Sequence, residues 1–127
     1  MGKEIPQITS KWMEKAFNDF HHAERSLENG DLEWAQLACQ QAAEKALKAV
    51  LLNQGMGLSK THELTSLARK IKAPKEIIAC CGMLNAFYTA SRYPDVEDFI
   101  DEGTMLSATR DGLEAAKKVL EWCKKKV

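Results

Sequence analysis

The residues best equipped to bind or act on an anion stand together at Ser91-Arg92-Tyr93-Pro94-Asp95. A guanidinium, a phenol and a carboxylate here follow directly on a long apolar segment with helical periodicity. Proline forces the residue before it out of the helical region and donates no backbone hydrogen bond, so the helix must end here. The segment therefore holds Arg92 and its neighbours at a rigid helix exit, where they can grip a phosphate or simply finish the helix.

Each of these residues has both a functional and a structural interpretation. Arg92 can hold a phosphate through two parallel hydrogen bonds, and Tyr93 can stack on a base. Alternatively, Arg92 complements the negative end of the helix dipole, and Tyr93 packs as an ordinary aromatic residue. Asp95 can pair with Arg92 or accept a proton, although an aspartate with an ordinary pKa of about 3.9 is a poor base at neutral pH.

A second polar group lies on the helix predicted over residues 32–53. Gln41, Glu44, Lys45 and Lys48 are three or four positions apart and therefore share one face, with Gln40 beside them. One interpretation is a solvated face carrying a Glu44–Lys48 ion pair. The other is the polar wall of a groove, in which glutamine amides and Lys45 or Lys48 meet a phosphate or a base.

The elements that must position these residues are all helical. Apolar residues recur every three or four positions, no stretch alternates at period two, and β-branched residues are sparse. The predicted helices cover about 10–28, 32–53, a short segment after 61, 74–91, and 104 to the lysine run at 124–126. Their expected N-caps are Thr9 or Ser10, Asp31, Thr61 and Thr104.

These helices predict one all-α domain over residues 1–127, an up-and-down bundle of four main helices plus a short fifth. Gly30 should close the first helix in the left-handed conformation. Helix 74–91 is apolar nearly all round, so we expect it to be the central, buried helix. The acidic segment after it, 95–102, has room for one short turn around Phe99 and Ile100.

Composition excludes several classes of protein. Of the 127 residues, 45% are hydrophobic and 28% charged, and 18 basic residues balance 18 acidic ones, so any anion site must come from local placement. The sequence contains no apolar run of membrane-spanning length and no signal peptide, and we expect a cytoplasmic protein. Cys39, Cys80, Cys81 and Cys123 fit no zinc spacing and are expected to be reduced packing residues.

His21 and His22 diverge on their helix, so neither a metal site nor a cofactor site is predicted. The run Lys124-Lys125-Lys126 is interpreted as a solvated helix end.

Three segments together resemble the HEPN family, the higher-eukaryote and prokaryote nucleotide-binding domains. They are Gln40-Gln41-Ala42-Ala43-Glu44-Lys45-Ala46-Leu47-Lys48-Ala49, Thr61-His62-Glu63-Leu64 and Arg92-Tyr93-Pro94-Asp95. The resemblance extends from about Trp12 to Lys124. It implies a helical bundle that is usually dimeric and associates with a nucleotide or RNA. It also implies a small nucleotidyltransferase partner in a toxin–antitoxin-like system.

Many members of that family are metal-independent endoribonucleases that carry an arginine and, roughly four to six residues later, a histidine. Arg92 matches the arginine, but no histidine follows it, since His62 is the last in the chain. His62, at the start of the short helix, and Asp95 are the candidates to replace the missing base. His62 can equally be an ordinary helix-entry residue.

Three functions therefore stay open. The first is a dimeric binding module in which Arg92, Tyr93 and Asp95 form a groove with the 41–48 stripe for a nucleotide, an RNA or the partner protein. The second is an endoribonuclease using Arg92 with a non-local base such as His62. The third is a structural adaptor. Phe87 and Tyr88 are candidates for a dimer surface.

Overall fold

A computed structural model of the chain describes residues 4–57, 60–92 and 101–127, which form five helices and no strand. The helices are α1 (Glu4–Glu28), α2 (Leu32–Asn53), α3 (Leu64–Lys70), α4 (Lys75–Arg92) and α6 (Glu102–Lys124). Four helices are long, and α3 has seven residues. The predicted all-α bundle of four main helices and a short fifth is confirmed. The turn predicted around Phe99 and Ile100 lies outside the described residues.

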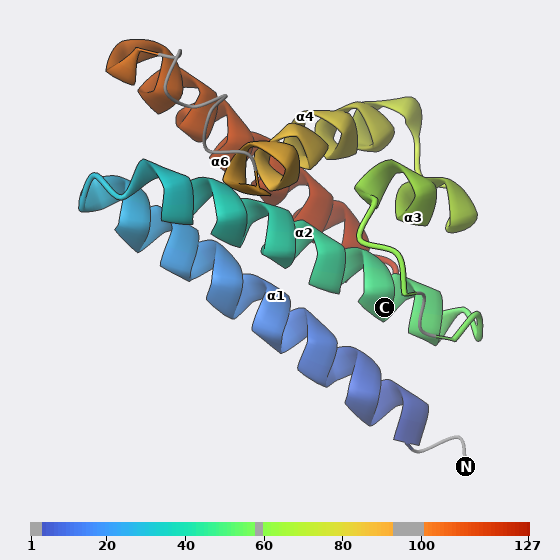
Figure 1. Cartoon of the computed structure of the whole chain (residues 1–127). Helices are drawn as coiled ribbons and strands as arrows, with labels where there is room; N and C mark the ends of the chain where they lie inside the picture. Colours follow the sequence, from blue (N-terminus) through green and yellow to red (C-terminus); the bar gives the residue numbers. More distant parts are fainter. Residues whose placement is uncertain (1–3, 58–59, 93–100) are drawn as a thin grey trace.

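Helix α2 forms the centre of the bundle, with α1 on one side and α4 and α6 on the other (Figure 1). Its alanines let the neighbouring backbones approach closely, because Ala35, Ala42, Ala46 and Ala49 have no exposed surface. The prediction that helix 74–91 is the central one is wrong. Met83 of α4 is 46% exposed, so one side of α4 faces solvent. The small alanines of α2 give a weaker hydrophobic pattern than α4 has, but they permit tighter packing.

The turn between α1 and α2 follows the sequence prediction at its glycine. Gly30 has a φ of +80°, and the Asp31 backbone N–H donates to the Ser26 carbonyl over 2.8 Å. This compact turn makes α1 and α2 antiparallel neighbours. Asp31 occupies the N-cap position of α2, but its side chain makes no capping hydrogen bond, so the turn depends on its backbone bonds.

Helix α1 begins six residues earlier than predicted, at Glu4 rather than Ser10. Thr9 and Ser10 therefore lie inside the helix and do not cap it. Pro6 falls in the first turn, where backbone N–H groups have no intrahelical partner in any case. The Thr9 side chain is buried instead, at 3% exposure.

Carboxylates, not the predicted threonines, cap α3 and α6. Glu63 rather than Thr61 accepts a hydrogen bond from the Ser66 N–H, and Asp101 rather than Thr104 accepts one from the Thr104 N–H over 2.8 Å. A carboxylate satisfies an unpaired N–H and also adds negative charge at the positive end of the helix dipole. This explains why each cap lies two or three residues from the predicted threonine.

The four cysteines are buried and unbridged, which confirms their prediction as packing residues. Burial raises the pKa of the Cys39 and Cys81 thiols to about 12, so neither forms a thiolate at neutral pH. Within the described ranges, none of the helices combines the length and apolar character that crossing a bilayer requires.

Candidate functional site

The polar stripe of α2 lines a surface pocket of about 330 Å³. Helix α2 supplies most of its wall, α1 contributes Trp12, and the segment before α3 contributes His62. The residues around the pocket are Trp12, Leu37, Gln40, Gln41, Glu44, Lys45 and His62. The structure thus brings Gln41, Glu44 and Lys45 together, and it adds His62, which the groove interpretation did not include.

Glu44 is the centre of the polar contacts in this pocket. Its carboxylate accepts from Lys48 Nζ at 2.9 Å, from His62 Nδ1 at 3.0 Å and more weakly from Gln40 Nε2 at 3.4 Å. The expected Glu44–Lys48 ion pair is therefore present, but it is not a solvated one. The two side chains are only 15% and 8% exposed.

The surroundings of Glu44 keep its carboxylate ionised. Burial by itself would raise the pKa of Glu44, but hydrogen bonds and charge from Lys48 and His62 outweigh burial, and the pKa is lowered from its ordinary value. Lys48 lies beneath the pocket rather than in its wall. The structure therefore places Lys48 against Glu44 and leaves Lys45 and Gln41 nearer to solvent.

His62 is held by α2 at two points while its side chain remains 57% exposed. Its Nδ1 meets Glu44, and its backbone carbonyl accepts from Gln40 Nε2 at 3.5 Å. Because a carboxylate only accepts hydrogen bonds, Nδ1 carries the proton in this contact. In the neutral imidazole, Nε2 then has the lone pair, the arrangement that suits a proton acceptor.

The segment that carries His62 is also tied to α4. Asn85 Nδ2 donates to Glu63 at 2.9 Å, and the Leu64 N–H donates to Asn85 Oδ1 at 3.0 Å. Burial opposes ionisation of Glu63, yet its bonds to Thr65, Ser66 and Asn85 lower its pKa. These contacts fix α4 beside the His62 segment.

Arg92 is the last residue of α4, seven positions after Asn85, or about 10 Å further along the helix axis. This confirms that the helix continues to the Arg92 position. The Arg92 side chain and the residues Tyr93 and Asp95 lie outside the part of the chain that the structure describes. Their predicted roles therefore stay predictions.

Lys45 forms an ion pair with Asp19 of α1, which fixes its ammonium at the α1–α2 junction. Neither the pairing of Lys45 with Asp19 nor the entry of Trp12 into this pocket was predicted from the sequence. Lys45 and Asp19 are 26 residues apart, so only the antiparallel pairing of two helices brings them together. The spacing of Trp12 from Lys11 and Lys15 was the available signal for an aromatic residue within a basic face.

No group of three or more histidine, cysteine, aspartate or glutamate side chains among residues 4–57, 60–92 and 101–127 is arranged to hold a metal ion. His21 instead contacts Glu24 across one turn of α1, at 2.9 Å on the surface.

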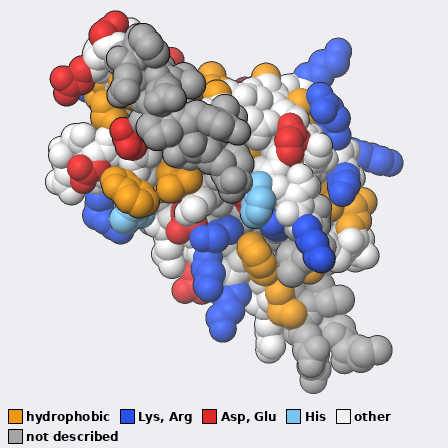
Figure 2. All heavy atoms as spheres, viewed as in Figure 1, with side chains coloured by type: hydrophobic (Ala, Val, Ile, Leu, Met, Phe, Trp, Pro, Cys, Tyr) orange, Lys and Arg blue, Asp and Glu red, His pale blue; other side chains and the backbone are white. Residues whose placement is uncertain are grey.

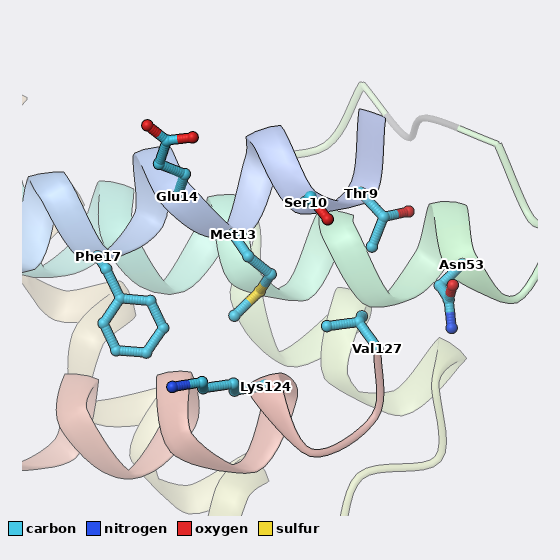
Figure 3. Close-up of a pocket in the computed structure, with 8 residues that line it drawn as sticks. All are labelled: Thr9, Ser10, Met13, Glu14, Phe17, Asn53, Lys124 and Val127. Carbon is cyan, nitrogen blue, oxygen red and sulfur yellow. The ribbon is translucent and has the colours of Figure 1, made fainter. Parts of the chain in front are cut away.

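A larger pocket, of about 480 Å³, lies on another side of α1, between α1, the end of α2 and the end of α6 (Figure 3). Figure 3 shows Met13 and Phe17 facing Lys124 and Val127 across it. The Lys124 ammonium lies 5.6 Å from the centre of the Phe17 ring. Glu14 also borders this pocket, but no ion pair joins the pocket's charged groups within the described residues.

Comparison with known proteins identifies the fold and its family. The HEPN domain model matches residues 9–126, nearly the whole chain. The chain belongs to the HEPN family. The resemblance inferred from the three sequence segments is thereby confirmed.

Solved structures agree with this assignment. TT1696 from Thermus thermophilus is 29% identical, with a TM-score of 0.82 over 94% of this chain and 98% of its own. ST0689, an archaeal HEPN homologue, is also 29% identical, with a TM-score of 0.76 over 92% and 95% of the two chains. A HEPN domain protein from Thermotoga maritima is 23% identical with a TM-score of 0.71 over 91% and 95%, a likeness of fold alone. A search of curated proteins found no match.

Proposed function

We propose that this HEPN chain is a nucleotide- or RNA-binding module whose site is the pocket on α2. One observation carries the proposal: Gln41, Lys45 and His62 converge on a single pocket beside an ionised and partly buried Glu44. A plain surface face would not require a buried carboxylate with three donors, because exposed ion pairs contribute little to stability.

The residue types suit a nucleotide. The Gln41 amide both donates and accepts, as the edge of a base requires, and Lys45 offers donors to phosphate oxygens. His62 adds a donor at Nε2 only when both of its ring nitrogens carry a proton. Arg92 would complete the site with a bidentate phosphate contact, and Tyr93 would stack on the base. Asp95 would orient Arg92 by pairing with it.

The course of α4 supports a role for Arg92 at this pocket. Helix α4 packs against α2, and it crosses α2 in the opposite direction (Figure 1). Asn85 lies at the level of the His62 segment, so the remaining two turns of α4 extend along α2 toward the start of α2.

We extend the proposal to the assembly. The module acts as a homodimer and pairs with a small nucleotidyltransferase in a toxin–antitoxin-like system. Phe87, a sequence candidate for the dimer surface, is excluded from that role, because its side chain is buried against α6. The support is the resemblance of the three segments to HEPN proteins of this kind. Light scattering at known concentration tests the dimer, and a monomer at micromolar concentration would contradict it. Co-purification with a nucleotidyltransferase encoded beside it tests the partner.

Titration of the purified chain with ATP, GTP and short RNA tests the binding proposal. We expect saturable binding that Arg92→Ala and Gln41→Ala each weaken at least tenfold, about 1.4 kcal/mol. Arg69→Ala is the matched control, because Arg69 is an exposed arginine outside the pocket. Absence of binding by the wild type, or equal binding by wild type and Arg92→Ala, would refute the proposal. A lowered melting temperature alone in Arg92→Ala would favour a structural adaptor.

A second candidate function, a metal-independent endoribonuclease, is favoured by the His62–Glu44 contact of 3.0 Å. A carboxylate that orients an imidazole is a recurring device of general-base catalysis. In such a reaction, His62 would take the proton of a ribose 2′-hydroxyl while the 2′-oxygen attacks the phosphorus. Arg92 would balance the phosphate charge, and the leaving 5′-oxygen would take a proton from solvent.

Cleavage of single-stranded RNA in EDTA tests this second function. The products would be a 2′,3′-cyclic phosphate and a 5′-hydroxyl. His62→Ala and Arg92→Ala should each abolish cleavage, while His22→Ala, at an exposed histidine outside the pocket, should leave it unchanged. RNA that stays intact during long incubation with the wild type excludes the activity.

A further inference from the structure

A second pocket adjoins the candidate site on α1, and the two share a wall. This pocket, of about 280 Å³, is bordered by Ile8, Lys11, Trp12, Lys15 and Lys45. Trp12 and Lys45 also line the pocket on α2. The two pockets therefore adjoin and form a depression in two parts, with Trp12 and Lys45 bordering both parts.

The α1 part of this depression is basic and aromatic. Ile8, Lys11, Trp12 and Lys15 recur at positions that share one helical face. Lys11 and Lys15 have no ion-pair partner among the described residues. Figure 2 shows Lys and Arg side chains gathered beside hydrophobic ones over α1.

Two carboxylates beside the shared residue Lys45 are already paired. Asp19 binds Lys45, and Glu44 binds Lys48 and His62. Glu14 borders the different pocket of Figure 3. The chain as a whole is neutral, so the charge of Lys11 and Lys15 is a local excess that is available to an anionic ligand.

We propose that the pocket around Trp12 is a second nucleotide subsite, so that the ligand is a single-stranded polynucleotide spanning both pockets and not a free mononucleotide. One base stacks on the Trp12 indole while Lys11 and Lys15 contact its flanking phosphates. Stacking on an aromatic residue and contacts to the backbone together bind single strands with little sequence preference. The inference rests on the proposed function, since the first nucleotide of the strand occupies the pocket on α2.

Binding of fluorescent oligoadenylates of one, four and eight nucleotides to the full chain tests this inference. RNA and DNA forms are used in parallel, because stacking and phosphate contacts are common to both and the two arms identify the sugar. We expect the affinity to rise at least tenfold from one to four nucleotides. A double variant, Lys11→Gln with Lys15→Gln, removes this gain and leaves AMP binding unchanged.

The salt dependence gives an independent readout. Each phosphate contact contributes about 0.7 to the slope of log affinity against log salt for a single strand. The double variant should therefore lower that slope by about 1.4. Lys117→Gln with Lys125→Gln, which removes two exposed lysines of the α6 end that line neither pocket, is the matched control.

Trp12→Leu tests the stacking contact, and it keeps an apolar side chain where Trp12 packs against the core. It should weaken binding of the four-nucleotide strand about tenfold without a change in circular dichroism. If the wild type binds AMP but gains nothing with length, or if the lysine variant keeps the gain, the subsite is refuted while the proposed function stands. If the wild type binds neither AMP nor any oligonucleotide, both the subsite and the proposed function are refuted.

Discussion

The pocket of Figure 3 and the pocket on α2 both border α1, and they differ more in chemistry than in size. The pocket of Figure 3 is larger, at about 480 Å³ against about 330 Å³ for the pocket on α2. Its charged groups are not joined to one another by ion pairs within the described residues, whereas the α2 pocket is built around the bonded set of Glu44, Lys48 and His62. Volume alone would favour the pocket of Figure 3. Convergent, partnered polar groups are instead the feature on which the proposed site on α2 rests.

Removing the central carboxylate should produce the largest effect. Glu44→Ala leaves the Lys48 ammonium, only 8% exposed, without its partner and should cost about 3 kcal/mol of stability. The measurement is urea unfolding. Glu14→Ala, in the pocket of Figure 3, should change the free energy of unfolding by less than about 0.5 kcal/mol. Equal losses in the two variants would show that the two pockets do not differ in this way.

The next largest effect is expected where α4 packs against α6. A Cβ at Gly112 of α6 would lie 2.1 Å from the Phe87 ring of α4, so Gly112→Ala should destabilise the fold by about 1–3 kcal/mol through overpacking. Gly82→Ala is the control, because its Cβ would meet only Thr65, at 3.9 Å. In thermal melts the control should match the wild type or exceed it, since alanine favours helix. A Gly112→Ala variant as stable as Gly82→Ala would mean that α4 and α6 separate without cost.

Two buried threonines provide a smaller test. Thr9, beside the pocket of Figure 3, has a buried hydroxyl that finds no hydrogen-bond partner among the described residues. Thr109 accepts from Gln36 at 2.8 Å and donates to the Met105 carbonyl at 2.7 Å. Thr9→Val should therefore stabilise the chain by up to about 1 kcal/mol, and Thr109→Val should destabilise it by about 1 kcal/mol. Chemical denaturation of both variants measures the difference. A loss of stability in Thr9→Val would indicate that its hydroxyl is satisfied in solution.

The smallest expected effect is on pH dependence. Since the pKa of Glu44 is lowered in the folded state from its ordinary value of 4.5, the ionised carboxylate stabilises the fold above that value, and this contribution is lost as pH falls through the lower, folded-state pKa. Unfolding free energies from about pH 6 to about pH 3 should fall less steeply for Glu44→Gln than for the wild type. Glu63 and Asp101 also have lowered pKa values. Both residues are present in the variant and in the wild type, so their contributions to the pH dependence cancel in the comparison. Parallel curves would contradict the assignment to Glu44.

Much of the fold was predictable because its signals are local. Helix α2 runs from Leu32 to Asn53, as predicted, since glycines with positive φ, Gly30 and Gly55, follow α1 and α2. The start of α1 and the capping carboxylates were missed because several neighbouring residues can serve as caps, and tertiary packing selects among them. The central position of α2 was missed because alanine has a small hydrophobic area and gives a weak core signal. Its small side chain nevertheless lets neighbouring helices pack closely against α2.

The candidate site was predictable only in part. Spacing along one helix placed Gln41, Glu44 and Lys45 on one face, and that arrangement is found. The approach of His62 to Glu44 depends on how the chain returns after α2, and no local pattern encodes it. Trp12 enters the pocket from α1 for the same reason.

The two sides of α2 have a joint consequence for recognition. Gln41, Glu44 and Lys45 project from a helix whose other side is buried among alanines. Their backbone is already ordered before any ligand arrives, so binding need restrict only side-chain rotamers. A scaffold of this kind can exchange the identity of its outward side chains, and with it the ligand it selects, while its interior stays the same.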